Sequence, residues 1–475
     1  MFKWLFGTII FLSIFFLNFL PVKDPDFGWH YRCGYELLQG HPCLSNTFTY
    51  FLADYQAFYP SFIYDALTAI VFNSVGFIGL SVVHALMMTG AFYLFYKLSK
   101  QNILFAGVLF LTVTFLSGGT LGLGWRPQIV TFFLILLGVW FLQNKKGFKI
   151  QGIHFQPIYF YPLLMLVWVN THIGFFTGLV IFGTYWIHTL VKFVRKKVNF
   201  QSVFRITAIG FLSFFSTLLN PFGYKVYIEI FNHLKSPLNT MIAEWVAPPP
   251  LYILIILISL ISIPLIQIAQ KKLSVFEMLT LLFFGITTLM ARRNVPLFLT
   301  FAGIQYLQLI PKKKFSDIFP LLLPFIGAVL LSVTFINIQK TVRFHTDWNI
   351  YCTKGATNYP CKAIQNYPKL SGNVYGAYEW GGFLIWQRPD IKIFVDGRMP
   401  AWFDEDGESP YNVYLKILQT QDGWNEKLRK YKTDYLLLAQ GTFLDLLLDE
   451  EAQTYGWEKV YEDKTHAIYK NLLTY

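Results

Sequence analysis

Long apolar segments recur through residues 1–339, and this pattern leaves few folds open to the chain. The segments cover residues 4–20, 77–96, 103–118, 128–143, 157–169, 174–193, 203–219, 251–269, 274–290, 295–310 and 318–338. A helix needs about 20 apolar residues to cross the hydrocarbon core of a bilayer. Because many segments approach this length, we predict a polytopic α-helical membrane protein with about 11 spans. The first span is expected to be retained rather than cleaved as a signal peptide.

The composition supports a membrane protein. Hydrophobic residues make up 54% of the chain and charged residues only 14%, whereas soluble domains carry about a quarter charged residues. Residues 60–75 are also apolar but include Asp65 and Asn73. This segment is therefore predicted to be a helix lying on the membrane surface rather than a span.

Clusters of lysine and arginine predict how the chain crosses the membrane. They lie at residues 97–100, 145–149, 195–197, 271–272 and 312–314. On the predicted spans these clusters all fall on one side, which is cytoplasmic by the positive-inside rule. The opposite, outer side then receives a first external loop at residues 21–60 and the whole tail. The net charge of +12 is thus a topology signal of a plasma-membrane (inner-membrane) protein rather than a nucleic-acid-binding patch.

The chain is predicted to divide into a transmembrane domain, residues 1–339, and a small extracytoplasmic α/β domain, residues 340–475. The turn-bounded β-rich runs predict strands at residues 373–378, 383–388, 391–395 and 434–439, and a closing hairpin at residues 457–462 and 466–470. Residues 442–455 are predicted to be a helix, with Thr442 as the N-terminal cap and Asp445 three residues later.

The four cysteines form two close pairs, Cys33 with Cys43 and Cys352 with Cys361. Both pairs fall on the predicted outer side, where an oxidising compartment favours disulfides. We therefore predict disulfides 33–43 and 352–361, with a reduced pair as the alternative.

Acidic residues are scarce in the membrane domain, with none between Ala66 and Ile228. Asp24 and Asp26 nevertheless stand together directly after the first apolar segment. An Asp-Pro turn would account for them structurally. If a helix begins near Asp26, however, His30 lies one turn along its face. A carboxylate there can accept a proton from a hydroxyl nucleophile, which makes Asp26, with Asp24 and His30, the candidate catalytic group.

Further polar residues interrupt the apolar segments on the same predicted side. They are Arg126, His172, Glu244, Arg292 and Arg293. Ionisable groups at a membrane edge are costly unless they are paired, face a cavity or act in function. The planar guanidinium groups suit phosphate oxygens, so these residues are predicted to bind substrate. Capping of helix ends is the alternative.

A divalent cation, Mg²⁺ or Mn²⁺, is the second role open to the acidic residues. Asp24, Asp26, His30 and Glu244 are of the residue types that such an ion takes as ligands. No cofactor is otherwise indicated.

These features resemble the C-type membrane glycosyltransferases (GT-C), which take a sugar from a polyprenyl-linked donor at the outer face of the membrane. The segment from Asp26 to Tyr31-Arg32 is similar in spacing to the first loop of the oligosaccharyltransferase branch, and Glu244 resembles its external-loop glutamate. The tail segments 379–386 and 394–398 resemble the Trp-Trp-Asp region of that branch. Because Tyr378-Glu379-Trp380 replaces the triplet itself, the resemblance implies no peptide acceptor.

The resemblance therefore implies a cell-envelope transferase with a lipid-linked sugar donor, membrane lipids around it and an acceptor of unknown kind. A membrane transporter or lipid flippase is the alternative from another class. Transporters place ionisable groups near the bilayer midplane, and here the spans hold few acids, Glu277 being the main one. A non-catalytic GT-C-like assembly subunit is the third alternative.

Overall fold

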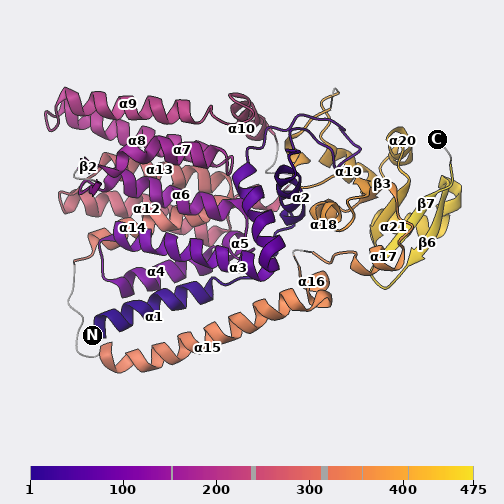
Figure 1. Ribbon diagram of the computed structural model, residues 1–475, viewed down its shortest axis with the longest axis horizontal. Helices are drawn as coiled ribbons and strands as arrows, with labels where there is room; N and C mark the ends of the chain where they lie inside the picture. Colours follow the sequence, from indigo (N-terminus) through magenta and orange to yellow (C-terminus); the bar gives the residue numbers. More distant parts are fainter. Residues whose placement is uncertain are drawn as a thin grey trace.

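A bundle of helices joined to a small mixed domain makes up the computed structural model (Figure 1). The structure describes residues 2–150, 153–236, 242–311, 319–355, 357–404 and 406–473. The bundle consists of α1 (Phe2–Leu17), α3 (Phe62–Ser99), α4 (Ile103–Leu116), α6 (Pro127–Gln143), α7 (Tyr161–Val169), α8 (Phe175–Val194), α9 (Phe200–Ser216), α12 (Pro250–Ala269), α13 (Val275–Met290), α14 (Val295–Leu309) and α15 (Phe319–Thr346). Each apolar segment named from the sequence falls on one of these helices, so the mostly helical architecture is confirmed.

Three of the described helical segments are long and apolar enough to cross a membrane, and they are Phe62–Ser99, Phe175–Val194 and Ala243–Ala269. Other apolar helices are shorter: α4 has 14 residues and α6 has 17. At 1.5 Å per residue these helices extend only about 21–26 Å, less than the ~30 Å hydrocarbon core. The count of about 11 spans therefore stays a prediction.

The segment predicted as a surface helix is the first part of α3. Gly76 breaks α3 with a left-handed φ of 68°, a conformation that favours glycine. Figure 1 places the part before this break across the end of the bundle, beside α2 (Phe27–Leu38). At Gly34 of α2, an added Cβ would lie 1.9 Å from the carbonyl oxygen of Asp65. The helix is thus confirmed, while its position relative to a membrane stays a prediction.

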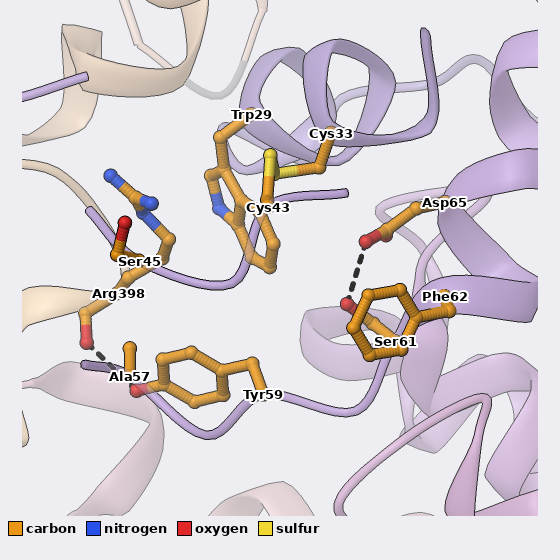
Figure 2. A pocket seen from close by; sticks show the side chains of 10 residues that line it. All are labelled: Trp29, Cys33, Cys43, Ser45, Ala57, Tyr59, Ser61, Phe62, Asp65 and Arg398. Atoms are coloured by element: carbon orange, nitrogen blue, oxygen red, sulfur yellow. Dashed lines mark hydrogen bonds between the residues drawn. A yellow bond between two sulfur atoms is a disulfide. The ribbon is translucent and has the colours of Figure 1, made fainter. Parts of the chain in front are cut away.

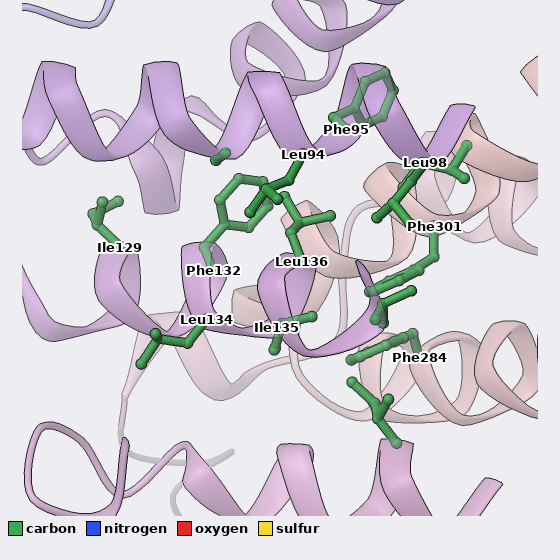
Figure 3. Close-up of a cluster of buried hydrophobic side chains, with 14 of the residues drawn as sticks. Leu94, Phe95, Leu98, Ile129, Phe132, Leu134, Ile135, Leu136, Phe284 and Phe301 are labelled. Carbon is green, nitrogen blue, oxygen red and sulfur yellow. The ribbon is translucent and has the colours of Figure 1, made fainter. Parts of the chain in front are cut away.

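The bundle core is formed by aromatic and branched side chains from α3, α6, α13 and α14 (Figure 3). Leu94 of α3 points toward Phe132 and Leu136 of α6, and all three are buried. Phe95 of α3 instead packs against Phe110 of α4. α6 is buried along most of its length, as expected of a helix surrounded by others. Since lipid tails are as apolar as these side chains, close packing rather than transfer from water holds such helices together.

The tail contains a five-stranded sheet in the order β4-β3-β5-β7-β6. The strands are β3 (Gly372–Gly376), β4 (Ile391–Ile393), β5 (Tyr435–Ala439), β6 (Trp457–Glu462) and β7 (His466–Asn471). β3 pairs in parallel with β4 and β5, whereas β7 pairs antiparallel with β5 and β6. Around the sheet lie α16 (Trp348–Lys354), α17 (Cys361–Asn366), α18 (Gly381–Gln387), α19 (Pro410–Leu418), α20 (Trp424–Lys430) and α21 (Phe443–Glu451).

The predicted strand at residues 383–388 is wrong, because these residues form the helix α18. Phe383, Leu384 and Ile385 are all buried, and a short apolar run does not distinguish a buried strand from a buried helix. The parallel pairing of β3 with β4 requires a crossover, which is usually helical. The other predicted strands and the hairpin are confirmed.

The predicted helix at residues 442–455 corresponds to α21 followed by the 3₁₀ turn Ala452–Tyr455. Thr442 occupies the N-terminal cap position, but its hydroxyl donates to the carbonyl of Ala439 instead of capping the helix. Asp445 accepts a hydrogen bond from the backbone of Gly441. The predicted position of the cap residue is thus correct, but the predicted hydrogen bond from the helix backbone to its side chain is absent.

Both predicted disulfides are present, with Cα–Cα distances of 5.5 Å for Cys33–Cys43 and 6.0 Å for Cys352–Cys361. Their sequence separations of 10 and 9 predict a stabilisation of about 2–3 kcal/mol each from loop closure. We expect alkylation without reductant to modify no cysteine, and Cys352→Ser/Cys361→Ser to lower the free energy of unfolding by about this amount. Free thiols in a folded, non-reduced sample would contradict the pairing.

Candidate functional site

A cavity of about 350 Å³ lies where the bundle, the first loop (residues 21–60) and the tail meet. We call it the junction cavity. It is lined by Asp26, Trp29, His30, Tyr59, Gln128, Thr131, His172, His233, Glu244, Trp245, Arg293, Tyr378 and Arg398, together with apolar side chains that include Leu121, Phe132, Ile173, Phe176 and Leu297. Figure 1 places the β1–β2 hairpin (Phe148–Ile150 and Ile153–Phe155) at the opposite end of the bundle. The cavity therefore combines polar groups with apolar walls at the tail end of the molecule.

The backbone of the tail positions Asp26 at the start of α2. Asp26 is the N-terminal cap residue of this helix, although its side chain makes no capping hydrogen bond. A Cβ added to Gly397 would lie 1.9 Å from Oδ1 of Asp26, and one added to Gly28 would lie 1.7 Å from the carbonyl oxygen of Gly382. Such close approach is open only to glycine. Gly28, Gly382 and Gly397 thus allow the tail to pack directly on the loop that carries Asp26.

The carboxyl group of Asp26 lies in an environment that favours its protonated form. Asp26 lines the cavity and is partly exposed to it. Burial, followed by the negative charge of Asp24, raises the pKa of Asp26 to about 7, against the opposing effects of His30 and Arg126. A carboxyl group with a pKa near neutrality can both accept and release a proton under physiological conditions.

Arg126 links two acidic residues behind the cavity wall. It precedes α6 in extended conformation, and it is only 4% exposed. Its Nε lies 3.5 Å from Oδ2 of Asp24, and its Nη2 lies 3.6 Å from Oε2 of Glu244. Arg293 approaches the other carboxylate oxygen of Glu244 at 3.3 Å. Although burial would raise the pKa of Glu244, the surrounding arginines lower it, so this residue is a carboxylate.

His30 is held by a buried carboxylate rather than by the acidic pair in its own loop. Its Nδ1 lies 2.6 Å from Oδ1 of Asp65, and the hydroxyl of Ser61 donates to the other oxygen of Asp65 at 2.8 Å. Figure 2 shows the hydrogen bond from Ser61 to Asp65 in a small cavity of about 30 Å³, which Trp29 also lines and which adjoins the junction cavity. The Cys33–Cys43 disulfide closes the other side. The side chain of His30 is therefore fixed in orientation.

His172 lies between α7 and α8 on the bundle side of the cavity. Its Nδ1 is 2.7 Å from the hydroxyl of Thr131, which accepts a hydrogen bond from the indole of Trp168 at 2.9 Å. Burial, together with the charge of Arg293, lowers the pKa of His172 well below its usual value. The ring is thus neutral and serves as a hydrogen-bonding group.

The residues predicted from the sequence are only partly brought together in the cavity lining. Asp26, His30, His172, Glu244 and Arg293 line the cavity. Asp24 and Arg126 lie behind it, and Arg292 is exposed outside the lining.

Several lining residues were missed by the sequence analysis, notably Tyr59, His233, Tyr378 and Arg398. Tyr59 donates to the carbonyl of Arg398 at 2.8 Å, as Figure 2 shows, and its hydroxyl lies 3.3 Å from Nε2 of His233. His233 belongs to α10 (Lys225–Lys235). Only Tyr378 and Arg398 had a sequence signal, because they adjoin or belong to the tail segments that resemble oligosaccharyltransferases. The others are joined by contacts between distant parts of the chain.

The side chains present do not fit the divalent cation that the sequence left open. Among the described residues, no group of three or more His, Cys, Asp or Glu side chains is arranged to hold a metal ion. Asp24 and Glu244 are paired with the guanidinium of Arg126, and His30 is paired with Asp65. A cation beside Arg126 would meet a repulsion of about 4 kcal/mol per unit charge at 4 Å.

The helical bundle with its C-terminal mixed domain resembles the fold of archaeal oligosaccharyltransferases, which are glycosyltransferases of the GT-C type. The oligosaccharyltransferase AglB from Archaeoglobus fulgidus, in complex with an inhibitory peptide and a dolichol-phosphate, matches with a TM-score of 0.59 over 94% of this chain and 70% of the other, at 11% identity. The apo form of the Archaeoglobus fulgidus enzyme matches with a TM-score of 0.56 at 10% identity, again over 94% and 70% of the two chains.

A third structure of the Archaeoglobus fulgidus enzyme, tethered to an acceptor peptide containing the NVT sequon, matches with a TM-score of 0.55. It covers 98% of this chain and 74% of the other, at 10% identity. No protein-family model and no curated protein sequence matches the chain. The shared feature is therefore the fold, over most of the chain.

Proposed function

We propose that this protein is a membrane glycosyltransferase that transfers a sugar from a polyprenyl-phosphate-type donor to an acceptor hydroxyl at the outer face of the membrane. The observation that carries the proposal is the junction cavity, where Asp26 and Arg293 share one partly apolar chamber at the end of the helical bundle. The fold similarity to oligosaccharyltransferases supports the same class of reaction. One of those structures contains a dolichol-phosphate, a ligand of the proposed donor type.

The donor phosphate is assigned to the arginine side of the cavity. Arg293 is accessible there, with its side chain 19% exposed and its guanidinium 4.5 Å from the ring centre of Trp245. An arginine guanidinium can donate two parallel hydrogen bonds to phosphate oxygens, and it stays charged at all relevant pH values. The apolar residues Phe176 and Leu297 also line the cavity and suit the first isoprene units of a lipid chain. The fully buried Arg126 contributes positive charge from behind the wall.

Asp26 is assigned the role of the base that activates the acceptor. The acceptor O–H gives its proton to the carboxylate of Asp26 while its oxygen forms a bond to the anomeric carbon. The bond from that carbon to the donor oxygen breaks, and its electron pair leaves with the lipid phosphate. Negative charge therefore grows on the phosphate in the transition state, where fixed cations have their largest effect. His30 and His172 would orient the sugar by hydrogen bonds.

A transfer assay on protein reconstituted in liposomes tests this proposal. We expect mass spectrometry to detect sugar-free polyprenyl phosphate when a panel of polyprenyl-phosphate sugars is supplied with mixed glycan, lipid and peptide acceptors. Arg293→Met should lower kcat/KM about tenfold to hundredfold, since a charged hydrogen bond is lost. Arg195 is exposed at the C-terminal end of α8, and Arg195→Met should leave kcat/KM unchanged. Intact donors that merely change leaflet would instead support a flippase.

A further inference from the structure

The position of Arg126 bears on whether the proposed reaction needs a metal ion. Arg126 lies between Asp24 and Glu244, at 3.5 Å and 3.6 Å respectively. Both carboxylates were candidate ligands for a divalent cation. In this structure a guanidinium takes up the space between them, and it is 4% exposed. One positive charge at the place that a metal ion would occupy is thus already present in the chain.

Arg126 also keeps unused hydrogen-bonding capacity. Its Nε and Nη1 have no hydrogen-bond partner among the described residues, although both are buried. Asp26 lies close enough to act on Arg126 electrostatically. A buried guanidinium keeps its charge, because arginine does not lose its proton in proteins. Because a buried guanidinium is unfavourable without negative partners, its two ion pairs with Asp24 and Glu244 hold Arg126 in place.

The carboxylates are unsuited to a second cation while Arg126 is in place. Magnesium requires near-ideal octahedral oxygen coordination, and Glu244 already faces both Arg126 and Arg293. His30 directs Nδ1 to Asp65, so it adds no ligand through that atom. A divalent ion would need to displace these contacts and approach two guanidinium groups.

We propose that the guanidinium of Arg126 takes the place of a divalent cation, so that lipid phosphate binds and sugar transfer proceeds without metal. Arg126 acts here as a positioning residue that holds Asp24 and Glu244 together and adds positive charge behind the donor phosphate. The inference rests on the proposed function for its substrate, but its central claim concerns ion binding and is measured without turnover.

Manganese binding, followed by electron paramagnetic resonance on the purified full chain after chelator treatment, provides the test. We expect no wild-type Mn²⁺ signal that depends on Asp24. Arg126→Met leaves Asp24, Asp26 and Glu244 without their shared cation, and this variant is expected to gain one bound Mn²⁺. The gained ion should be lost again in Arg126→Met/Glu244→Gln. In parallel, the affinity of the wild type for polyprenyl phosphate should change less than twofold between EDTA and Mn²⁺.

Two results would overturn the inference. The first is one tightly bound Mn²⁺ in the wild type that disappears in Asp24→Asn or Glu244→Gln. The second is a folded Arg126→Met variant that binds no Mn²⁺. The wild-type measurement does not depend on any variant folding, and Arg126→Lys, which keeps the charge, serves as the control that should gain no ion. Absence of sugar transfer would count against the proposed function while leaving the ion-binding result intact.

Discussion

Asp26→Asn is expected to lower the rate of sugar transfer by about 10²–10⁴-fold, the usual contribution of a general base. The amide keeps the shape of the side chain but cannot accept the acceptor proton. Because burial and Asp24 raise the pKa of Asp26 to about 7, the base is mostly protonated below that pH. In the wild type, kcat/KM should rise tenfold per pH unit up to about pH 7 and then level off. Asp26→Asn should lose this rise.

Two other aspartates of residues 21–60, Asp54 and Asp24, provide the controls for this experiment. Asp54 is exposed in the same loop, residues 21–60, so Asp54→Asn should leave the rate and the pH profile unchanged. Asp24 is 3% exposed and paired with Arg126, which makes it a positioning residue in our proposal. Asp24→Asn should therefore lower the rate but keep a rise with pH. That rise should level off at a lower pH than in the wild type, because the charge of Asp24 helps to raise the pKa of Asp26. If kcat/KM were independent of pH in Asp24→Asn but rose normally in Asp26→Asn, Asp24 would be the base and Asp26 the positioning residue.

Arg398→Met is expected to destabilise the tail by about 3–5 kcal/mol, because it breaks a buried ion pair on one side only. Asp396 is fully buried and Arg398 is 6% exposed. The guanidinium donates to both carboxylate oxygens, at 2.9 Å and 2.6 Å, and to the side chain of Asn46 at 3.1 Å. Methionine keeps much of the length but leaves the carboxylate without its partner. Denaturant unfolding of the detergent-solubilised protein measures the loss.

Arg32→Met is the matched control for this substitution. Arg32 pairs with Glu36 one turn along α2 at 2.7 Å, but both side chains are more than a quarter exposed. Water screens such a pair, so its loss should cost about 0–1 kcal/mol. The double variant Asp396→Leu/Arg398→Met should recover part of the lost stability, since no unpaired charge is then buried. Equal losses in Arg398→Met and Arg32→Met would contradict the importance of burial.

Local patterns in the sequence were sufficient to predict most of the secondary structure. The apolar segments correspond to helices because a helix satisfies its backbone hydrogen bonds within one continuous segment, as an apolar environment requires. The strands 373–378, 391–395 and 434–439 and the terminal hairpin were found because turn residues bound short β-rich runs. The segment 383–388 was mistaken for a strand because the crossover that requires a helix there depends on a distant pairing.

The short cysteine spacings and the acidic residues of the first loop were also visible in the sequence. Both disulfides close loops of about ten residues. Whether two cysteines so close in sequence form a disulfide depends mainly on how oxidising their compartment is. Asp24 and Asp26 were noticed because acidic residues are rare in residues 1–339. Spacing alone favoured Asp26 without separating their roles.

Only the tertiary structure distinguished the two aspartates and assembled the site around them. Asp26 faces the cavity because Gly382 and Gly397, more than 350 residues further along the chain, allow the tail backbone to approach it. Asp24 is directed instead to Arg126, and His30 to Asp65. These contacts depend on how distant segments pack, which residue spacing does not record. The sequence by itself therefore determined which residues carry charge at the tail end of the bundle, while packing decided that a guanidinium lies between the carboxylates.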